Sequence, residues 1–512
     1  SYGFILYSIN FTHSSQKKKN LEMQASLTKG LQNMFIPPCI KLKFKQLSLV
    51  IFKGKDLMSN DLMSKVDPVV QVEINGNVLH TKSHKDEENP DFNQKMMMSI
   101  VVPTVDETLN IRLLDQDLLG NEILGSHTFR LRDIEGLATK PGDPSSKISR
   151  KYEYPLWVPF YGAPRKIKHK ERAQEMRESY EMGSTYIGSL MLHMKLDPTD
   201  RPIEEVRTIT TRESENSKNF VDVDVRAIID VVYVQGMFVK AKKARLVVSW
   251  LDETFRSEEF SVQNGVILTN YVFKLSKTFP VDQRNLQKDL FEFIPPAILG
   301  VEVEGVCVSF YKFEASRFKF SPQANGRVLT VSLRVDRAVV DARPEYGGRA
   351  SVRASFDSQP RTEAEQLGWL PLARQKVLRG KLLIDLFQAR DLLASDNSGT
   401  SDPVVQFYHL GSMLRSSVVK GSLAPCWNQQ LVMQTNFFDL DPSANSNLGI
   451  RVPDLIVSVW DEDPSGLLQP EKFEFLGEHI LQLSQRDLVS DVTELRGPPT
   501  PRWFELTSAG AR

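Results

Sequence analysis

Short runs of apolar residues, many of them β-branched, recur along most of the chain and are separated by Asn, Asp, Gly, Ser or Pro. Apolar and polar residues alternate with a period of two most clearly at 221–225, 301–304 and 331–335. This alternation is typical of strands that bury one face, and frequent turn residues between short strands favour an antiparallel arrangement. The sequence therefore predicts an all-β fold of tandem antiparallel β-sandwiches rather than an α/β fold.

The chain contains an internal repeat. Residues 49–57 reappear in type at 384–392, at an offset of 335 (384 − 49 = 335). The same offset aligns 67–71 with 402–406, and both segments read Asp-Pro-Val-Val-Gln. Because an offset sustained without a gap through a whole segment marks a duplicated structural unit, we predict two copies of one domain.

The repeat and the strand pattern divide the chain into five parts. We assign the first copy, together with an extension after it, to residues 39–198 and the second copy to 377–512. A third sandwich is predicted at 218–337. The segment 338–376 is rich in Arg, Ser, Gly and Pro and is predicted to be a linker. Residues 1–38 show no periodicity and form an N-terminal extension.

Composition narrows the classes of function. Lys and Arg number 64 and Asp and Glu also 64, so the formal net charge is zero. This balance, with no motif that places aromatic residues among a basic run, argues against a nucleic-acid partner. Three cysteines and eight histidines without C-x-x-C spacing provide neither a disulfide framework nor a zinc cluster. Because the sequence contains no catalytic triad order, phosphate loop or kinase motif, we expect no enzymatic activity in this chain.

Each copy carries five acidic residues at equivalent places in two loops. Two Asp residues lie six apart after the first strand, and an Asp-x-Asp pair followed by Glu-x-Leu-Gly lies in a later loop. The sets are Asp61, Asp67, Asp115, Asp117 and Glu122 in the first copy, and Asp396, Asp402, Asp461, Asp463 and Glu474 in the second.

The chemistry of these sets points to Ca²⁺, which takes oxygen ligands from carboxylates on flexible loops. Crowded carboxylates repel one another unless a cation lies between them. Hard oxygen donors without sulfur or imidazole favour Ca²⁺ over zinc or copper. We therefore predict one Ca²⁺-binding region in each copy. The alternatives are that the acids only form turns, or that they are paired carboxylates of a glycosidase type, which a duplication on small sandwiches disfavours.

Apolar residues stand beside the acids in both copies. Once Ca²⁺ cancels the local negative charge, such side chains are expected to enter the headgroup region of an anionic membrane. The alternative is that some of them pack beneath the loops as a small satellite core, for which Leu392 and Leu393 are the strongest cases. The residues assigned to the membrane are Met58, Leu62, Met63, Leu118 and Leu119 in the first copy and Leu467 and Leu468 in the second.

Basic residues follow the acidic loop in each copy. Lys82 and Lys85 in the first copy and Arg415 and Lys420 in the second are expected on a strand that contacts anionic headgroups. The competing interpretation is a solvated strand edge protected by its charges against aggregation. A denser basic run at 165–170 is interpreted as an exposed connector, because charges of both signs follow it.

The order of these motifs resembles the C2 domain. The resemblance covers about 41–130 and 378–508 and rests on a strand, an Asp-x5-Asp-Pro-Val loop, a basic strand, Pro-x-aromatic-Asn and Asp-x-Asp. It implies two sandwiches of C2 type with calcium loops, which bind phospholipid when Ca²⁺ is present. Between them, Asp230 and the segment 310–314 stand where the acids of such loops would be. We interpret the middle sandwich as a degenerate C2-like module without Ca²⁺.

A narrower resemblance is to ferlins. The segment 159–165 followed by 186–192 resembles the extension after an internal ferlin C2 domain, and the insertion 439–452 resembles that of a more C-terminal one. Ferlins are large multi-C2 proteins that promote Ca²⁺-triggered vesicle fusion and are anchored by a C-terminal transmembrane helix. The resemblance implies a ferlin section that binds anionic phospholipid during vesicle docking, fusion or exocytosis. It also implies contact with fusion-machinery proteins, on the cytosolic face of a vesicle or the plasma membrane.

Two other functions remain open from the sequence. One is a calcium-independent multi-C2 scaffold for protein interactions, in which the acids are turn residues. The other is a regulatory section of a lipid-modifying enzyme whose catalytic part lies outside this chain.

Overall fold

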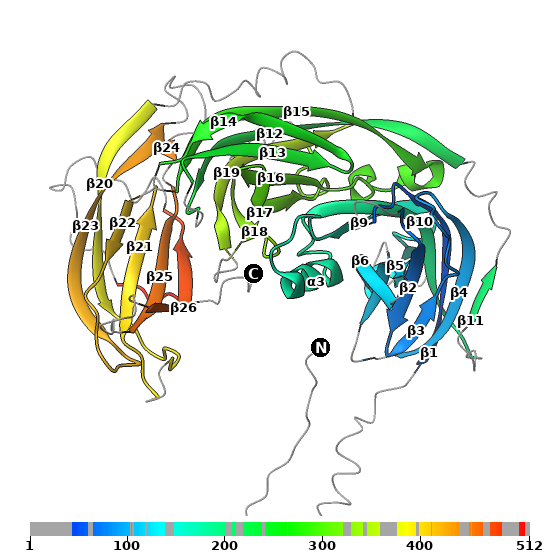
Figure 1. Ribbon diagram of the computed structural model, residues 1–512, viewed down its shortest axis with the longest axis horizontal. Coiled ribbons are helices and arrows are strands. Elements are labelled where there is room, and N and C mark those ends of the chain that lie inside the picture. Colours follow the sequence, from blue (N-terminus) through cyan, green and yellow to red (C-terminus); the bar gives the residue numbers. More distant parts are fainter. Residues whose placement is uncertain are drawn as a thin grey trace, which may run out of the picture.

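Three β-sandwiches follow one another along the chain and lie side by side in an arc, with the middle one between the other two (Figure 1). The computed structural model describes residues 43–59, 65–102, 104, 107–117, 120–138, 148–200, 207–210, 219–237, 241–263, 265–320, 329–340, 346–358, 376–395, 399–410, 412–439, 450–451, 453–463, 472–483 and 501–506. Neighbouring strands in each sheet pair antiparallel, so the predicted all-β fold is confirmed.

The first sandwich is a nine-stranded sheet that folds over on itself. Its order is β11-β4-β1-β10-β9-β6-β5-β2-β3, and the two layers meet where Ser126 of β6 pairs with Tyr161 of β9. Alternating buried residues such as Met96, Met98 and Ile100 fill the core between the layers. The strands are β1 (Lys43–Lys55), β2 (Pro68–Ile74), β3 (Asn77–His80), β4 (Asp91–Val102), β5 (Thr108–Asp117), β6 (Gly120–Arg130), β9 (Leu156–Gly162), β10 (Thr185–Pro198) and β11 (Arg207–Thr210).

Three small elements join these strands. Helix α2 (Leu131–Glu135) and the hairpin of β7 (Leu137–Ala138) with β8 (Ile148–Ser149) lie between β6 and β9. Helix α3 (Lys170–Glu178) lies between β9 and β10 and buries Ala173, Met176 and Arg177. The basic run before it, predicted as an exposed connector, contains the exposed Lys166 and Lys168 and leads into this packed helix.

The middle sandwich is an eight-stranded sheet in the order β14-β13-β16-β17-β18-β19-β12-β15. Trp250 lies at its centre against the rings of Phe279 and Phe356. The elements are β12 (Phe220–Gln235), β13 (Lys243–Trp250), β14 (Glu253–Ser261), β15 (Ile267–Asp282), the 3₁₀ turns η3 (Gln283–Gln287) and η4 (Leu290–Glu292), β16 (Ala297–Val303), β17 (Val306–Phe313), β18 (Leu329–Val335) and β19 (Tyr346–Asp357).

Strand β19 corrects the predicted linker at 338–376. It pairs with β12 on one side and β18 on the other, inside the middle sandwich. Val352 and Phe356 enter the core, while Arg353 on the opposite face forms a buried ion pair of 2.8 Å with Asp230 of β12. Arg, Ser and small residues gave this segment the composition of a linker, because the partner that makes a buried Arg tolerable lies far away in the sequence.

The last sandwich repeats the first with the same offset. Its sheets have the orders β20-β23-β24 and β22-β21-β25-β26 around a core that includes Trp427 and Phe407. Strands β21 and β22 have the bounds of β2 and β3 displaced by 335 residues (403 − 68 and 412 − 77). The strands are β20 (Lys376–Gln388), β21 (Pro403–His409), β22 (Ser412–Arg415), β23 (Cys426–Asp439), β24 (Ile450–Arg451), β25 (Leu455–Asp463) and β26 (Lys472–Leu481).

Candidate functional site

Asp67 and Asp115 come together at one end of the first sandwich. Asp67 directly precedes β2, and the pairing of Pro68 with Asp115 brings the two acids together. The backbone N–H of Asp67 donates to Oδ1 of Asp115 at 2.7 Å, and the N–H of Asp86 donates to Oδ1 of Asp67 at 2.7 Å. These bonds fix two carboxylates that the sequence placed in separate loops.

The last sandwich contains the same network. The N–H of Asp402 donates to Oδ1 of Asp461, and the N–H of Gly421 donates to Oδ1 of Asp402 at 2.7 Å. The donors Asp86 and Gly421 are again 335 residues apart (421 − 86). Only 5% of Asp115 and 1% of Asp461 is exposed, so each acid is recessed beneath its loop. The duplication therefore extends from the sequence to the hydrogen bonds.

The fifth predicted acid lies opposite the buried Asp in each copy but already has a partner. Glu122 pairs in register with Asp115, and its carboxylate forms an ion pair with Arg177 of α3. Glu474 pairs in register with Asp461 and accepts a hydrogen bond from Ser395. The structure thus places both glutamates beside the aspartates while giving each a different contact.

The rest of the acidic sets is only partly described. The backbone of Asp117 ends β5 and that of Asp463 ends β25. Within the ranges given above, no group of three or more His, Cys, Asp or Glu is close enough to hold a metal ion. The predicted calcium sites therefore stay a prediction. Outside the described residues lie Asp61, Asp396, Leu62, Met63, Leu118, Leu119, Leu467 and Leu468.

The acids that are described fit a hard cation in the nature of their donors. Asp67 and Asp115 belong to one hydrogen-bonded network, as do Asp402 and Asp461, and all four residues supply carboxylate oxygens. In each pair, backbone N–H groups donate to Oδ1. These hydrogen bonds orient the carboxylate and leave its negative charge in place. Ca²⁺ binds such oxygens readily, so these four residues are the ones that would hold it.

The structure describes the surroundings of three apolar tip residues. Met58 is partly buried against the apolar cluster between the first and middle sandwiches, and its N–H donates to the carbonyl of Ile187 at 2.9 Å. Part of the side chain stays accessible, so its predicted contact with a membrane stays a prediction. In the last sandwich Leu392 is buried in the core, whereas Leu393 is 70% exposed.

The predicted basic residues lie at or after the short third strand of each copy. Lys82 and Lys85 are exposed in the loop after β3 and not on the strand itself. Arg415 ends β22, lies 4.6 Å from the ring centre of Phe473 and forms an ion pair of 3.7 Å with Glu462. Lys420 is exposed in the following loop.

In the middle sandwich, the positions that correspond to the acids serve contacts between and within domains. Burial raises the pKa of the Asp230 carboxyl, an effect opposed by Arg353. Lys312, at the place expected for Asp-x-Asp, lies partly buried between the rings of Tyr161 and Tyr180, at 4.3 and 4.2 Å from their centres. Burial lowers the pKa of Lys312 to about 7. This contact could not be predicted from the sequence, because the two tyrosines belong to the first sandwich.

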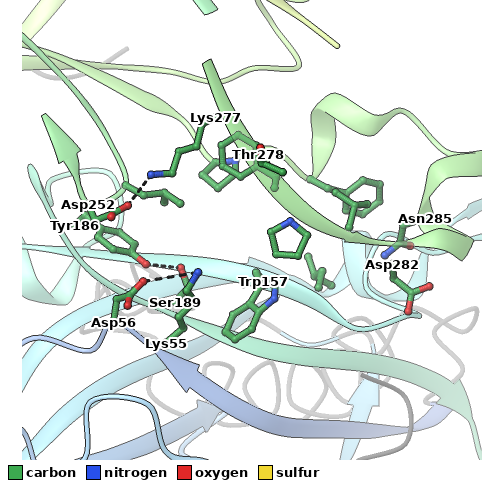
Figure 2. A pocket seen from close by; sticks show the side chains of 17 residues that line it. Lys55, Asp56, Trp157, Tyr186, Ser189, Asp252, Lys277, Thr278, Asp282 and Asn285 are labelled. Carbon is green, nitrogen blue, oxygen red and sulfur yellow. Dashed lines mark hydrogen bonds and ion pairs between the residues drawn. The ribbon is translucent and has the colours of Figure 1, made fainter. Parts of the chain in front are cut away.

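A cavity of about 140 Å³ lies between the first and middle sandwiches (Figure 2). Trp157 and Phe279 are among its apolar residues. Its polar groups bind one another: Lys277 forms an ion pair of 2.7 Å with Asp252, and Tyr186 and Ser189 share a hydrogen bond of 2.9 Å. Each of these pairs lies within one domain, and the cavity is part of the contact between the two domains because both contribute to its lining.

The first and last sandwiches match the C2 domain family, at residues 45–148 and 380–506. These two sandwiches are of C2 type. The middle sandwich lies outside both matched segments. The predicted fold of C2-type sandwiches is thus confirmed, and so is the repeat. Among the described residues, no helix is long and apolar enough to cross a membrane.

Several known proteins share short segments with this chain. Human protein piccolo is 30% identical over 141 residues, which cover 25% of this chain and 2% of piccolo. Protein SRC2 of Glycine max is 32% identical over 114 residues, 20% of this chain and 38% of that protein. Fer-1-like protein 4 of Mus musculus is 24% identical over 150 residues, 29% of this chain and 7% of that protein. The chain thus covers well under half the length of each of these relatives.

Among solved structures, a pair of C2 domains from Extended-Synaptotagmin 2 aligns at 11% identity and a TM-score of 0.20. The alignment covers 61% of this chain and 90% of that one. The resemblance to Fer-1-like protein 4 agrees with a multi-C2 protein, whereas origin from a ferlin stays a prediction.

Proposed function

We propose that this protein binds anionic phospholipid membranes through its two C2 domains when Ca²⁺ occupies their acidic loops. The observation that carries the proposal is the duplicated network of Asp67 with Asp115 and of Asp402 with Asp461. Two sets of buried or half-buried carboxylates, held in the same register, are an arrangement that a divalent cation stabilises. The proposal assigns no catalytic step to the chain.

Three kinds of residue contribute to membrane binding in different ways. Without a cation, the aspartates repel anionic lipid, and bound Ca²⁺ would supply the positive charge that reverses this repulsion. Exposed Lys82, Lys85 and Lys420 add attraction, at about 1 kcal/mol for each basic residue near an anionic surface. The exposed side chain of Leu393 is placed to enter the headgroup region of the membrane.

We extend the proposal to vesicle docking, fusion or exocytosis on the cytosolic face of a vesicle or the plasma membrane. The resemblance of 159–165 and 186–192 to ferlin extensions, together with the matching segment of Fer-1-like protein 4, supports a ferlin-like section. Fusion-machinery proteins are then the proposed protein partners. Cosedimentation of the chain with such proteins, with and without vesicles, tests this extension separately from lipid binding.

Cosedimentation with phosphatidylserine vesicles tests the central proposal. The wild-type chain should pellet with vesicles in Ca²⁺ and remain in solution in chelator. In the variant Asp67→Asn/Asp115→Asn/Asp402→Asn/Asp461→Asn, each Asn keeps an oxygen that accepts the backbone N–H but loses the charge, so pelleting in Ca²⁺ should be lost. Asp224→Asn is the control, because this carboxylate accepts a hydrogen bond from Thr278 in the middle sandwich, away from both loops. Equal pelleting of wild type and the fourfold variant would refute the proposal.

A second candidate function is a calcium-independent scaffold. It is favoured by the contacts of Glu122 with Arg177 and of Glu474 with Ser395, which give two predicted ligands protein partners. A ligand that binds only the folded state must stabilise it. The scaffold function therefore predicts an unchanged melting temperature in millimolar Ca²⁺, whereas the Ca²⁺-binding function predicts a rise that the fourfold Asn variant lacks.

A further inference from the structure

Arg177 brings a buried positive charge to the acidic end of the first C2 domain. Only 7% of the residue is exposed, and its Nη1 contacts Oε1 of Glu122. Its Nε is buried and has no hydrogen-bond partner within the described part of the chain. Because a buried guanidinium is costly unless it is paired, Glu122 is the group that makes this position tolerable.

The partner of Arg177 is one of the acids expected to bind Ca²⁺. Glu122 lies directly across from Asp115 in the β5–β6 register, and Asp115 is hydrogen-bonded to Asp67. The guanidinium therefore supplies one positive charge to a set of acids that otherwise requires a cation. Each positive charge next to such a set weakens the attraction that a metal ion experiences there.

In the last C2 domain, the described contact of the corresponding glutamate is with a hydroxyl group. Glu474, in register with Asp461, contacts the hydroxyl of Ser395. Arg177 stands on α3, in the segment between β9 and β10, and the described part of the last sandwich contains no helix. The two domains thus share their aspartate network, but the described contacts of the fifth acid differ: an arginine in the first domain and a serine hydroxyl in the last.

Helix α3 is held in place from its other side by the middle sandwich. The backbone N–H groups of Lys168 and His169, just before the helix, donate to the carbonyl of Ala338 at 2.7 and 3.1 Å. Arg172 donates to the carbonyl of Val340 at 3.4 Å. In Figure 1 the helix lies below the middle sandwich and beside β6. Arg177 is therefore positioned by contacts that do not depend on the acidic loops.

We propose that Arg177 is an internal cation that competes with Ca²⁺ for Glu122, so that the first C2 domain binds Ca²⁺ more weakly than it would without this ion pair. This inference rests on the proposed function, because it concerns the regulation of the same acidic loops. The first domain responds only at higher Ca²⁺ concentration, when Glu122 is drawn away from the helix.

Calorimetric titration of the full chain with Ca²⁺ tests the inference. The substitutions Asp402→Asn and Asp461→Asn first silence the last domain, so that the remaining heat comes from the first. Adding Arg177→Gln removes the charge while keeping a polar side chain of similar shape. The dissociation constant should fall on the order of tenfold, since a unit positive charge no longer opposes the ion. Adding Glu122→Gln as well should abolish this gain, because the freed carboxylate is its source.

Two further variants keep the test decisive. Arg172→Gln on the same helix loses a contact with the middle sandwich but leaves Glu122 untouched, so it should not change the dissociation constant. Arg177→Lys retains the charge on a shorter side chain and should give an intermediate dissociation constant. It provides the test if the Gln variant does not fold. Folded Gln or Lys variants with the unchanged constant of their background would overturn the inference.

The outcome also separates this inference from the proposed function. A wild-type chain that shows no Ca²⁺ heat contradicts Ca²⁺ binding by either domain. A wild-type chain that binds Ca²⁺, with an Arg177→Gln variant that does not differ from its background, contradicts only the role of Arg177.

Discussion

The two C2 domains are alike in their aspartate networks and unlike in how the middle sandwich holds them. The first shares with it an apolar cluster that includes Tyr161, Met176, Phe310 and Val339. The last is joined by polar contacts: Gln235 binds the backbone of Leu410 and Asp454 at 3.0 and 3.2 Å, and Arg349 forms an ion pair of 2.8 Å with Asp454. One duplicated domain has therefore acquired two kinds of attachment.

The difference teaches how the chain is expected to move. Opening an apolar interface costs free energy, at about 25 cal/mol for each Å² of apolar surface exposed. A polar interface between domains opens more easily because water replaces its hydrogen bonds. We expect the first and middle sandwiches to unfold as one unit and the last to reorient more freely. The Ca²⁺ response of the last domain would then reach a membrane without moving the other two.

The largest expected effect comes from the apolar interface. Phe310→Ala removes a ring that is 1% exposed in the shared cluster and should lower the free energy of unfolding of the first and middle unit by about 3–5 kcal/mol. Denaturant unfolding, monitored by the proteolysis of each domain, measures this loss of free energy. Phe387→Ala, at a residue 47% exposed in the last sandwich, is the matched control and should have little effect. If the two variants cost the same, the first interface is not the stabilising one.

A smaller loss is expected at the polar interface. Gln235→Leu leaves the N–H of Leu410 and the carbonyl of Asp454 without the amide that binds both. Each buried polar group left unpaired costs about 1–3 kcal/mol, although water that enters the opened interface recovers part of it. We expect faster proteolysis between the middle and last sandwiches, with the unfolding of the first unchanged. A loss that spreads to the first domain would contradict the separation of the two interfaces.

The first interface should also depend on pH. Lys312 has a pKa of about 7 in the folded chain against 10.5 as its ordinary value, so between these values the unfolded chain binds the additional proton. Stability of the first and middle unit therefore rises as pH increases above 7, by at most about 1.4 kcal/mol per pH unit. Melting temperatures at pH 7 and 8 measure the effect. Lys312→Met should remove that part of the slope, and an identical slope in wild type and variant would exclude Lys312 as its source.

Much of this architecture was predictable from sequence because its signals are local. Period-two alternation and the 335-residue offset predicted the sandwiches and located Asp67, Asp115, Asp402 and Asp461, which the structure brings together in pairs. The offset carries over to strand bounds because the same residues form the same turns.

What sequence missed depends on partners that are distant in the chain. The sequence predicts a linker at strand β19 because its Arg residues indicate exposure. Arg353 is buried only because it pairs with Asp230, which lies 123 residues away. The contact of Met58 with the apolar cluster between the first and middle sandwiches is likewise not predictable, because residues of that cluster follow much later in the chain. In the sequence, Arg177 is one basic residue in a segment with charges of both signs. Its contact with Glu122, at a separation of 55 residues, is seen only in the structure. Ion pairs between residues that are far apart in the sequence leave no periodic pattern.

The smallest expected effect tests whether the exposed tip of the last domain touches lipid. Leu393 is 70% exposed, whereas its neighbour Leu392 is buried in the core. Leu393→Asp should weaken binding to phosphatidylserine vesicles in Ca²⁺ by about fivefold, because a partly inserted Leu contributes roughly 1 kcal/mol and a carboxylate is repelled. Leu393→Ser separates the two causes, since it removes apolar area without adding charge. Unchanged vesicle binding in both variants would place the membrane contact of this domain elsewhere. It would also argue against the proposal that the last domain reorients to bring this tip to a membrane.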